Sequence, residues 1–414
     1  MFKKSIILFV LIAALVVGVV GCGGGEPSDG PVAQQPAAPA APPAPVYQYD
    51  NGRYRGTYGD SGEQQVSIQF DLTNDVISNV SFRHLFYNGV NFRTAAEGSV
   101  EYPVRLQHQQ IAEYLEGKSI DTIAELRSPG SFVQDVDGYS GATIRGSKLY
   151  SAMRDALNRG LYTPSGDFSR DPGTHPDGRY RGTYGDSGEQ QVSIQFNVQG
   201  NAISSVSFRH LQYNGEIYRN LSQDAVNYPV WQQHQQIAEY LEGKPLAAIF
   251  DLHSPGNFVE DVDGFSGATI RANKLFSAIM NGLSRNIYQS TGTIPQQIGT
   301  FVDGRYRGTY GDSGEQQVSV QFDVENNTVK NVSFRHLFYN GSNYRRLSEN
   351  DVNFPVWNQH EQIIAYLEDK PLSAVFDLHT PGDFVDDVDG FSGATVRGNK
   401  IFSAMIDGLN RGLY

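Results

Sequence analysis

Short stretches in the first part of the chain alternate between apolar and polar residues. Segments 66–70 and 80–84 alternate, with apolar side chains at Val66, Ile68 and Phe70 and at Val80 and Phe82, the period of a strand with one buried face. Segment 53–58 leads into the Gly-Asp-Ser-Gly sequence at 59–62, which is typical of a hairpin turn. These stretches predict antiparallel strands joined by tight turns.

The period changes to that of an α-helix after Pro103. Segment 106–115 predicts a helix, and segment 120–126 predicts a shorter one. In segment 149–157 the apolar residues fall at i, i+3, i+4, i+7 and i+8, which predicts an amphipathic helix that ends at Gly160. An antiparallel sheet with helices packed against it belongs to the α+β class.

This pattern occurs three times. The segment DGYSGAT at 137–143 returns as DGFSGAT at 263–269 and at 389–395, with a constant period (269 − 143 = 126 and 395 − 269 = 126). A period this long predicts separate domains with their own cores rather than the stacked units of a solenoid. We expect three tandem copies of one small domain, at residues 49–162, 177–288 and 303–414. Polar linkers containing Gly and Pro are expected to join these domains flexibly.

The N-terminal region has the pattern of a secretion signal. Two lysines precede an apolar run at 6–20, whose 15 residues (20 − 6 + 1) fall short of the roughly 20 that a spanning helix needs. The run ends in Gly-Cys, which resembles a bacterial lipobox, so we expect a lipoprotein signal peptide over 1–21 and lipidation at Cys22. An ordinary cleaved signal and an uncleaved anchor are the alternatives. A Pro/Ala-rich linker follows over 22–48.

Composition excludes several classes of function. The formal net charge is −13 and the sequence contains no Lys/Arg-rich block, which disfavours nucleic-acid binding. The single cysteine excludes a disulfide framework, a cysteine-ligated iron–sulfur cluster and a CxxCH haem site. The histidines show no metal-binding spacing, so no metal site is expected.

The repeated segment lies directly before the last helix of each copy. Gly141 and Ala142 permit close approach of a ligand, and helix N-termini favour phosphate groups. Arg145 follows two residues after the segment, and Lys148 lies further along the helix. This arrangement favours an anion beside Thr143, although a helix cap without a ligand has the same sequence pattern.

The segments DGYSGAT and DGFSGAT resemble the Asp-x-x-(Ser/Thr)-Gly-Ala-Thr signature of FMN-binding domains, found in Na⁺-pumping NADH:quinone reductase, in Rnf complexes and in extracellular bacterial flavoproteins. The DGRYRGTY opening and the order of strands and helices resemble that family over each whole copy. In the family, a transferase joins the FMN phosphate to the last threonine of the signature. One difference is the arginine two residues after this threonine, where the family often has Thr or Ser.

The resemblance implies specific roles for the signature residues. It assigns covalent FMN phosphoester links to Thr143, Thr269 and Thr395. It assigns recognition by the FMN transferase to Asp137, Asp263 and Asp389. It also places these small residues at the cofactor: Ser140, Gly141, Ala142, Ser266, Gly267, Ala268, Ser392, Gly393 and Ala394.

Two sets of histidines also recur with the period. His84, His210 and His336 fall in the alternating strand, and we predict core positions for them in preference to contact with flavin. His108, His234 and His360 fall on the middle helix, where they are either surface residues or contacts to the cofactor. The aromatic residues Tyr139, Phe265 and Phe391 either stack on the flavin or pack under the helix.

Together these features predict an extracytoplasmic electron-transfer flavoprotein, lipid-anchored to the bacterial membrane, that carries three covalent FMN groups. No Rossmann GxGxxG sequence is present, so a carrier is expected rather than a stand-alone enzyme, and no catalytic residues are assigned. Its expected partners are an FMN transferase, a quinone- or flavin-linked membrane redox protein, and an external electron acceptor or reductase. The alternatives are a non-redox surface lipoprotein that binds a phosphorylated or glycan ligand, and a flavin-bearing extracellular terminal reductase.

Overall fold

The computed structural model describes residues 46–134, 146–260, 272–290, 298–386 and 398–414. Within it, residues Tyr47–Tyr414 form one compact unit of mixed α+β structure with three antiparallel sheets. In the described part of the chain, no helix combines the length and the apolar character that crossing a membrane requires. The predicted signal peptide over 1–21 and the predicted lipidation site Cys22 lie outside the described residues.

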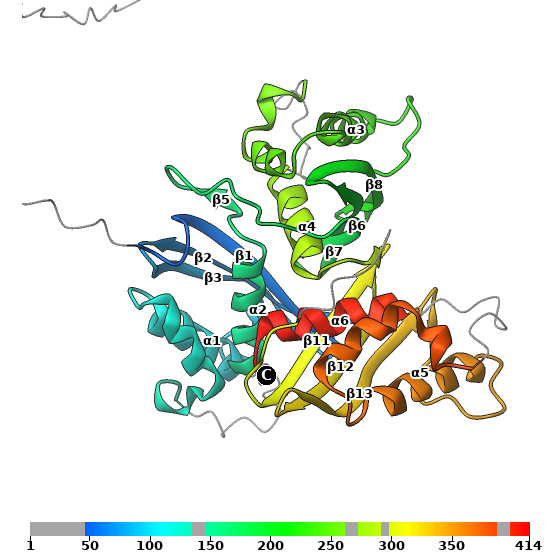
Figure 1. The fold of residues 1–414 in the computed structure, drawn as a ribbon. Coiled ribbons are helices and arrows are strands. Elements are labelled where there is room, and N and C mark those ends of the chain that lie inside the picture. The colour runs from blue at the N-terminus through cyan, green and yellow to red at the C-terminus, as the bar shows by residue number, and fades with distance from the viewer. Residues whose placement is uncertain (1–45, 135–145, 261–271, 291–297, 387–397) are drawn as a thin grey trace, which may run out of the picture. The chain divides into compact units, whose positions relative to one another are not determined.

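The first sheet has the strand order β4-β3-β2-β1-β5 (Figure 1). The second has the order β10-β6-β7-β8-β9, and the third β11-β12-β13-β14. The strands span, in chain order, Gly52–Asp60 (β1), Glu63–Thr73 (β2), Val76–Tyr87 (β3), Val90–Asn91 (β4), Thr163–Pro164 (β5), Gly178–Asp186 (β6), Glu189–Gln199 (β7), Ala202–Tyr213 (β8), Glu216–Ile217 (β9), Gln289–Ser290 (β10), Gly304–Asp312 (β11), Glu315–Glu325 (β12), Thr328–Tyr339 (β13) and Ser342–Asn343 (β14).

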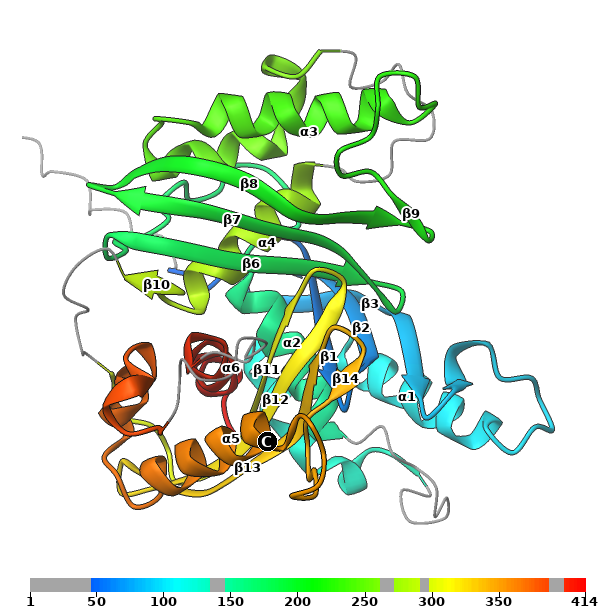
Figure 2. The same ribbon diagram turned by 90° about the vertical axis from the view of Figure 1, so that its right-hand side faces the viewer.

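Two α-helices pack against each sheet, one on its first long strand and one on its third, as β6, β8, α3 and α4 illustrate (Figure 2). The α-helices are Tyr102–Leu115 (α1), Gly146–Asn158 (α2), Tyr228–Leu241 (α3), Ala272–Ser284 (α4), Phe354–Leu367 (α5) and Gly398–Arg411 (α6). The 3-10 helices are Phe92–Thr94 (η1), Ile120–Arg127 (η2), Pro129–Ser131 (η3), Leu246–His253 (η4), Pro255–Asn257 (η5), Leu372–His379 (η6) and Pro381–Asp383 (η7). The helix predicted over 120–126 is therefore present as a 3-10 helix.

The hairpin between β1 and β2 follows from its turn residues. Ser61 and Gly62 both have positive φ angles, 57° and 87°, as a two-residue type I′ turn requires. The resulting register sets Tyr54 opposite Phe70, and both rings are buried. The period-two pattern therefore predicted the core face of this sheet correctly.

Each sheet has its own hydrophobic core. In the first, Val66, Ile68 and Phe70 are fully buried against Leu149 and Met153 of α2. Separate clusters of the same kind lie under the second and third sheets. The amphipathic pattern of segment 149–157 is thus confirmed as the core-facing side of a helix.

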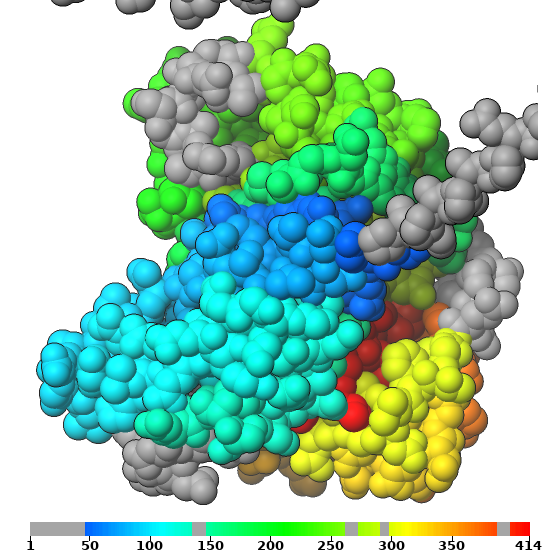
Figure 3. Space-filling view, turned by 90° about the vertical axis from the view of Figure 1, so that its left-hand side faces the viewer, coloured from blue at the N-terminus to red at the C-terminus, as the bar shows by residue number. Residues whose placement is uncertain are grey.

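The expectation of flexibly joined domains is wrong. Part of the opposite face of β2 is also buried, at Gln65 and Ser67, and the Ser67 hydroxyl donates to Asp186 of the second sheet at 2.9 Å. Arg83 also donates to Asp186, at 2.6 Å. These hydrogen bonds join the first and second sheets directly, and the blue and green stretches of the chain lie against each other (Figure 3).

The same contact recurs at two further boundaries and closes a cycle. Asp312 of the third sheet accepts from Ser193 and Arg209 of the second, at 2.7 and 2.6 Å. Asp60 of the first sheet accepts from Ser319 and Arg335 of the third, at 2.9 and 2.7 Å. Each sheet therefore donates hydrogen bonds from a serine and an arginine to one neighbouring sheet, and its own aspartate accepts them from the other.

The first predicted linker, 163–176, is partly structured. Its first two residues form β5, which pairs with β1. Further along, the Ser169 amide donates to Asp50 at 3.1 Å, and Arg170 forms an ion pair with Asp251. These contacts explain why the segment does not act as a free tether.

Candidate functional site

The repeated signature itself lies outside the described residues, which omit 135–145, 261–271 and 387–397. This applies to every residue that the resemblance assigns to FMN or to the transferase, including Thr143, Thr269 and Thr395. The residues on either side of each gap are described, and they show where the chain enters and leaves it.

Both ends of the first gap are anchored in the fold. The backbone amide of Gln134 donates to the Gln110 side chain on α1 at 2.8 Å. The chain is described again from Gly146, the first residue of α2. The other two gaps begin with the same contact: Glu260 donates to Gln236 at 2.9 Å, and Asp386 to Gln362 at 2.7 Å.

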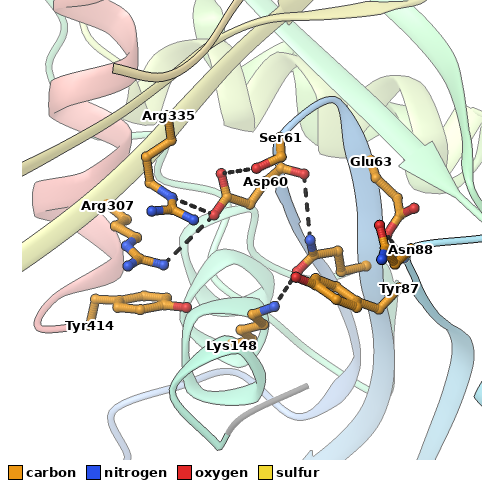
Figure 4. A pocket seen from close by; sticks show the side chains of 10 residues that line it. Asp60, Ser61, Glu63, Tyr87, Asn88, Lys148, Arg307, Arg335 and Tyr414 are labelled. Atoms are coloured by element: carbon orange, nitrogen blue, oxygen red, sulfur yellow. Dashed lines mark hydrogen bonds and ion pairs between the residues drawn. The ribbon is translucent and has the colours of Figure 1, made fainter. Parts of the chain in front are cut away.

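A polar cavity of about 240 Å³ lies beside the first turn of α2 (Figure 4). The first and third sheet regions both contribute to its walls. Its lining residues are Asp60, Ser61, Glu63, Gln65, Tyr87, Asn88, Lys148, Arg307, Arg335 and Tyr414.

Lys148 reaches the cavity from the first turn of α2 (Figure 4). Its ammonium group donates to the Gln65 side chain at 2.6 Å and lies 4.5 Å from the centre of the Tyr87 ring. The side chain is buried although it carries a charge. The contact between cation and ring recurs in the other two sheet regions, where Lys274 lies 4.7 Å from the centre of the Tyr213 ring and Lys400 lies 4.4 Å from that of Tyr339.

Asp60 forms the opposite wall. Its carboxylate accepts from Arg335 at 2.7 Å, and Arg307 lies at 3.7 Å. Burial alone would raise the pKa of Asp60, but the charge and hydrogen bond of Arg335, together with Ser319 and Arg307, lower it overall. Asp60 is therefore held as a carboxylate.

Aromatic rings complete the wall. The Arg307 guanidinium lies 3.9 Å from the centre of the Tyr414 ring, and Tyr414 stacks on Tyr58 at 5.9 Å. The charged lining residues are Lys148, Arg307 and Arg335 against Asp60 and Glu63, a net charge of 3 − 2 = +1. Cationic groups beside aromatic rings suit a ligand that combines an anionic group with a planar ring.

The histidines of the middle helices are buried. The alternative that they are surface residues is therefore wrong. His108, His234 and His360 are at most 2% exposed, and each Nδ1 lies 2.6 Å from the carbonyl oxygen four residues earlier. Because a carbonyl only accepts, Nδ1 carries the proton and Nε2 is an acceptor. Each Nε2 is buried without a hydrogen-bond partner among the described atoms. Burial lowers the pKa of all three to about 4.

The strand histidines lie elsewhere than predicted. His84 is half-buried and its ring touches Gly188 of the second sheet's hairpin rather than the first core. His210 contacts Gly314 and His336 contacts Gly62 in the same way. Their position follows from the second buried face of the strands, which the alternating pattern did not reveal.

The residues present fit the cofactor that the resemblance implies. Lys148 is a buried cation that already donates to Gln65 and suits a nearby anionic group, and the buried Nε2 of His108, which has no partner among the described atoms, can accept from a ring N–H. Within the described ranges, no group of three His, Cys, Asp or Glu side chains is arranged to hold a metal ion.

Sequence reasoning missed Asp60, Gln65 and Tyr87. Asp60 was part of a predicted turn, but its partners Arg307 and Arg335 come from a different sheet. The recurrence of these residues with the 126-residue period was the available signal, and it does not separate functional from duplicated positions. No family model, curated protein or solved structure matches this chain.

Proposed function

We propose that the chain consists of three tandem copies of one FMN-binding domain and acts as an extracytoplasmic, lipid-anchored electron carrier with three covalent FMN groups. The observation that carries this proposal is the threefold DG(Y/F)SGAT signature directly before α2, α4 and α6. The resemblance of that signature identifies the ligand as FMN, attached at Thr143, Thr269 and Thr395.

The surroundings of the signature support the attachment. Each gap is followed at once by a helix N-terminus, where backbone N–H groups and the helix dipole favour a phosphate. Lys148 adds a cation on the first turn of α2, and Lys274 and Lys400 do so on α4 and α6. A phosphoester retains one negative charge, which these groups stabilise.

Nearby side chains have defined roles in this proposal. Tyr87 offers an aromatic surface beside Lys148, and His108 offers a hydrogen-bond acceptor in an apolar environment. Asp60 and Arg335 fix the wall of the cavity. When bound, FMN supplies the electron-transfer chemistry, while the chain binds and orients it.

Mass spectrometry tests the attachment. The full-length chain, produced with an FMN transferase, is expected to carry three FMN masses and to retain yellow fluorescence on a denaturing gel. Thr143→Ala, Thr269→Ala and Thr395→Ala are each expected to remove one FMN mass, because each removes one hydroxyl that forms the ester.

Thr73→Ala, at an exposed threonine far along the chain from any signature, is the matched control and is expected to retain all three masses. A chain without adducts that still retains a phosphorylated ligand would support the non-redox binding alternative. An adduct that persists in the triple variant would overturn the assignment of the threonines.

A further inference from the structure

A second cavity, of about 140 Å³, lies where the three sheet regions meet. Three arginines at the C-terminal ends of α2, α4 and α6 line it: Arg159, Arg285 and Arg411. All three are at most 4% exposed. Glutamines from the three hairpins, Gln64, Gln190 and Gln316, also line it.

Each arginine bridges two sheet regions. Arg159 donates to the carbonyl oxygen of Thr183 at 2.5 Å, and Arg411 to that of Thr57 at 2.7 Å. Arg285 donates in the same way to the carbonyl of Thr309. The guanidinium groups are thereby fixed at the cavity.

Only two carboxylates, those of Asp155 and Asp407, lie beside the three arginines. Arg159 pairs with Asp155 at 2.7 Å, and Arg411 pairs with Asp407 at 2.9 Å. At the corresponding position of α4 the chain has Asn281, whose side-chain oxygen accepts from Arg285 at 3.1 Å.

The ion pairs between sheet regions lack a carboxylate at the same position. Arg411 reaches Asp155 at 3.2 Å and Arg285 reaches Asp407 at 3.1 Å. The equivalent partner for Arg159 would be residue 281, an asparagine. The cluster therefore has a net charge of 3 − 2 = +1.

A buried positive charge requires compensation, and arginine does not lose its proton in proteins. Burial lowers the pKa of the Arg285 guanidinium, and Arg411 and Arg159 lower it further while Asp407 opposes them. Burial alone would also lower the pKa of Arg411, but Asp407 and Asp155 raise it overall, so burial is the main cause of the lowered pKa of Arg285.

We propose that this cavity binds one small inorganic monoanion, such as chloride, held by Arg159, Arg285 and Arg411. The volume is ample for such an ion, and the charge of −1 balances the cluster. The site is separate from the proposed flavin sites, because the signatures precede the N-terminal ends of the helices whose C-terminal ends carry the arginines. A helix of 13 residues is about 20 Å long, so Arg159 and Lys148 lie at opposite ends of α2, although both cavities border the β1–β2 hairpin.

Thermal unfolding of the full-length chain in sodium chloride and in equimolar sodium gluconate tests the proposal. Gluconate is too large to replace chloride among the arginines, so the wild-type melting temperature is expected to be higher in chloride by about 2 °C or more. Asn281→Asp supplies the missing carboxylate that α2 and α6 already have. This variant is expected to lose the chloride dependence and to melt in gluconate at least as high as the wild type does in chloride.

Asn257→Asp is the matched control, since it makes the same change at an exposed position where the third copy also has aspartate (257 + 126 = 383). It is expected to retain the full chloride dependence. In crystals grown with bromide, an anomalous peak is expected within contact distance of the three guanidinium groups. Equal melting temperatures of the wild type in both salts, or bromide-containing crystals without a peak at the arginines, would overturn the proposal. So would an Asn281→Asp variant that keeps the chloride effect.

Discussion

Three buried histidines make the stability of this protein sensitive to acid. His108, His234 and His360 lie in the cores beside Phe82, Phe208 and Phe334, with ring centres 5.3–5.5 Å apart. Their pKa of about 4 lies below the ordinary value of 6.5, so the unfolded chain binds more protons between these two pH values. The free energy of unfolding is therefore largest above pH 6.5 and falls as the pH drops toward 4.

His360→Leu tests this dependence. Between pH 7.5 and pH 4.5 the variant is expected to lose less stability than the wild type, by up to about 3 kcal/mol, because one buried group no longer has to accept a proton. Urea unfolding at the two pH values measures the difference. The pH 7.5 data serve as the control, since the histidine is neutral there. A variant with the pH dependence of the wild type would show that this histidine titrates normally.

The sequence predicted whether a single residue is buried only where the local strand or helix pattern alone decides its burial. Val66 and Phe70 were predicted as core residues because the strand alternates, and they are buried. Ser67 lies on the polar side of the same pattern, yet it is buried because Asp186 of another sheet accepts its hydrogen bond. No local pattern contains that contact, since 119 residues separate the two partners.

At the scale of elements, the packing of helix on sheet depends on a glycine in the first strand of each sheet. A methyl group on Gly182 of β6 would lie 1.9 Å from the carbonyl oxygen of Ala278 in α4. Gly56 and Gly308 have the same close contact with α2 and α6. The neighbouring atoms belong to the helix backbone, so a larger residue must displace the whole helix.

Gly182→Ala is expected to destabilise the protein by about 2 kcal/mol or more, because overpacking at a rigid contact shifts the backbone. Gly256→Ala in η5 is the control: its added methyl group meets no atom within 4 Å, and its φ is not positive. We expect a change within about 1 kcal/mol for the control. Equal effects of the two substitutions in urea unfolding would refute the packing argument.

The elements themselves were largely predictable, and their ends were not. Segment 106–115 was predicted as helix, and α1 covers it but begins at Tyr102. Pro103 lies in the first turn, where its missing N–H group costs no hydrogen bond, so the proline starts the helix rather than preceding it. The signature that carries the proposed function lies outside the described residues, so its assignment still rests on the sequence.

At the scale of the whole molecule, three buried aspartates connect the sheets into one unit. Asp60, Asp186 and Asp312 are each at most 3% exposed, and each pairs with arginines of a neighbouring sheet region. For Asp312, burial opposes ionisation, but Arg209, Ser193 and Arg181 lower its pKa overall. Its contribution to stability is therefore present above pH 3.8 and is lost as the pH falls through the lower pKa of the folded state.

Asp312→Asn tests whether these boundaries hold the molecule together. The substitution leaves Arg209 and Arg181 without their carboxylate. Removing one partner of a fully buried pair costs about 3–5 kcal/mol, and because the Arg209 side chain is 36% exposed, a loss at the lower end of that range is expected. Asp323→Asn is the control, because its partner Arg305 is half exposed and the pair lies within one sheet; a loss of at most about 1 kcal/mol is expected. If the two variants unfold at the same urea concentration, the boundaries contribute no more than a surface ion pair. A selective loss in Asp312→Asn means that the buried ion pairs at the boundaries hold the three sheet regions in fixed positions, which flexible tethers between them would not do.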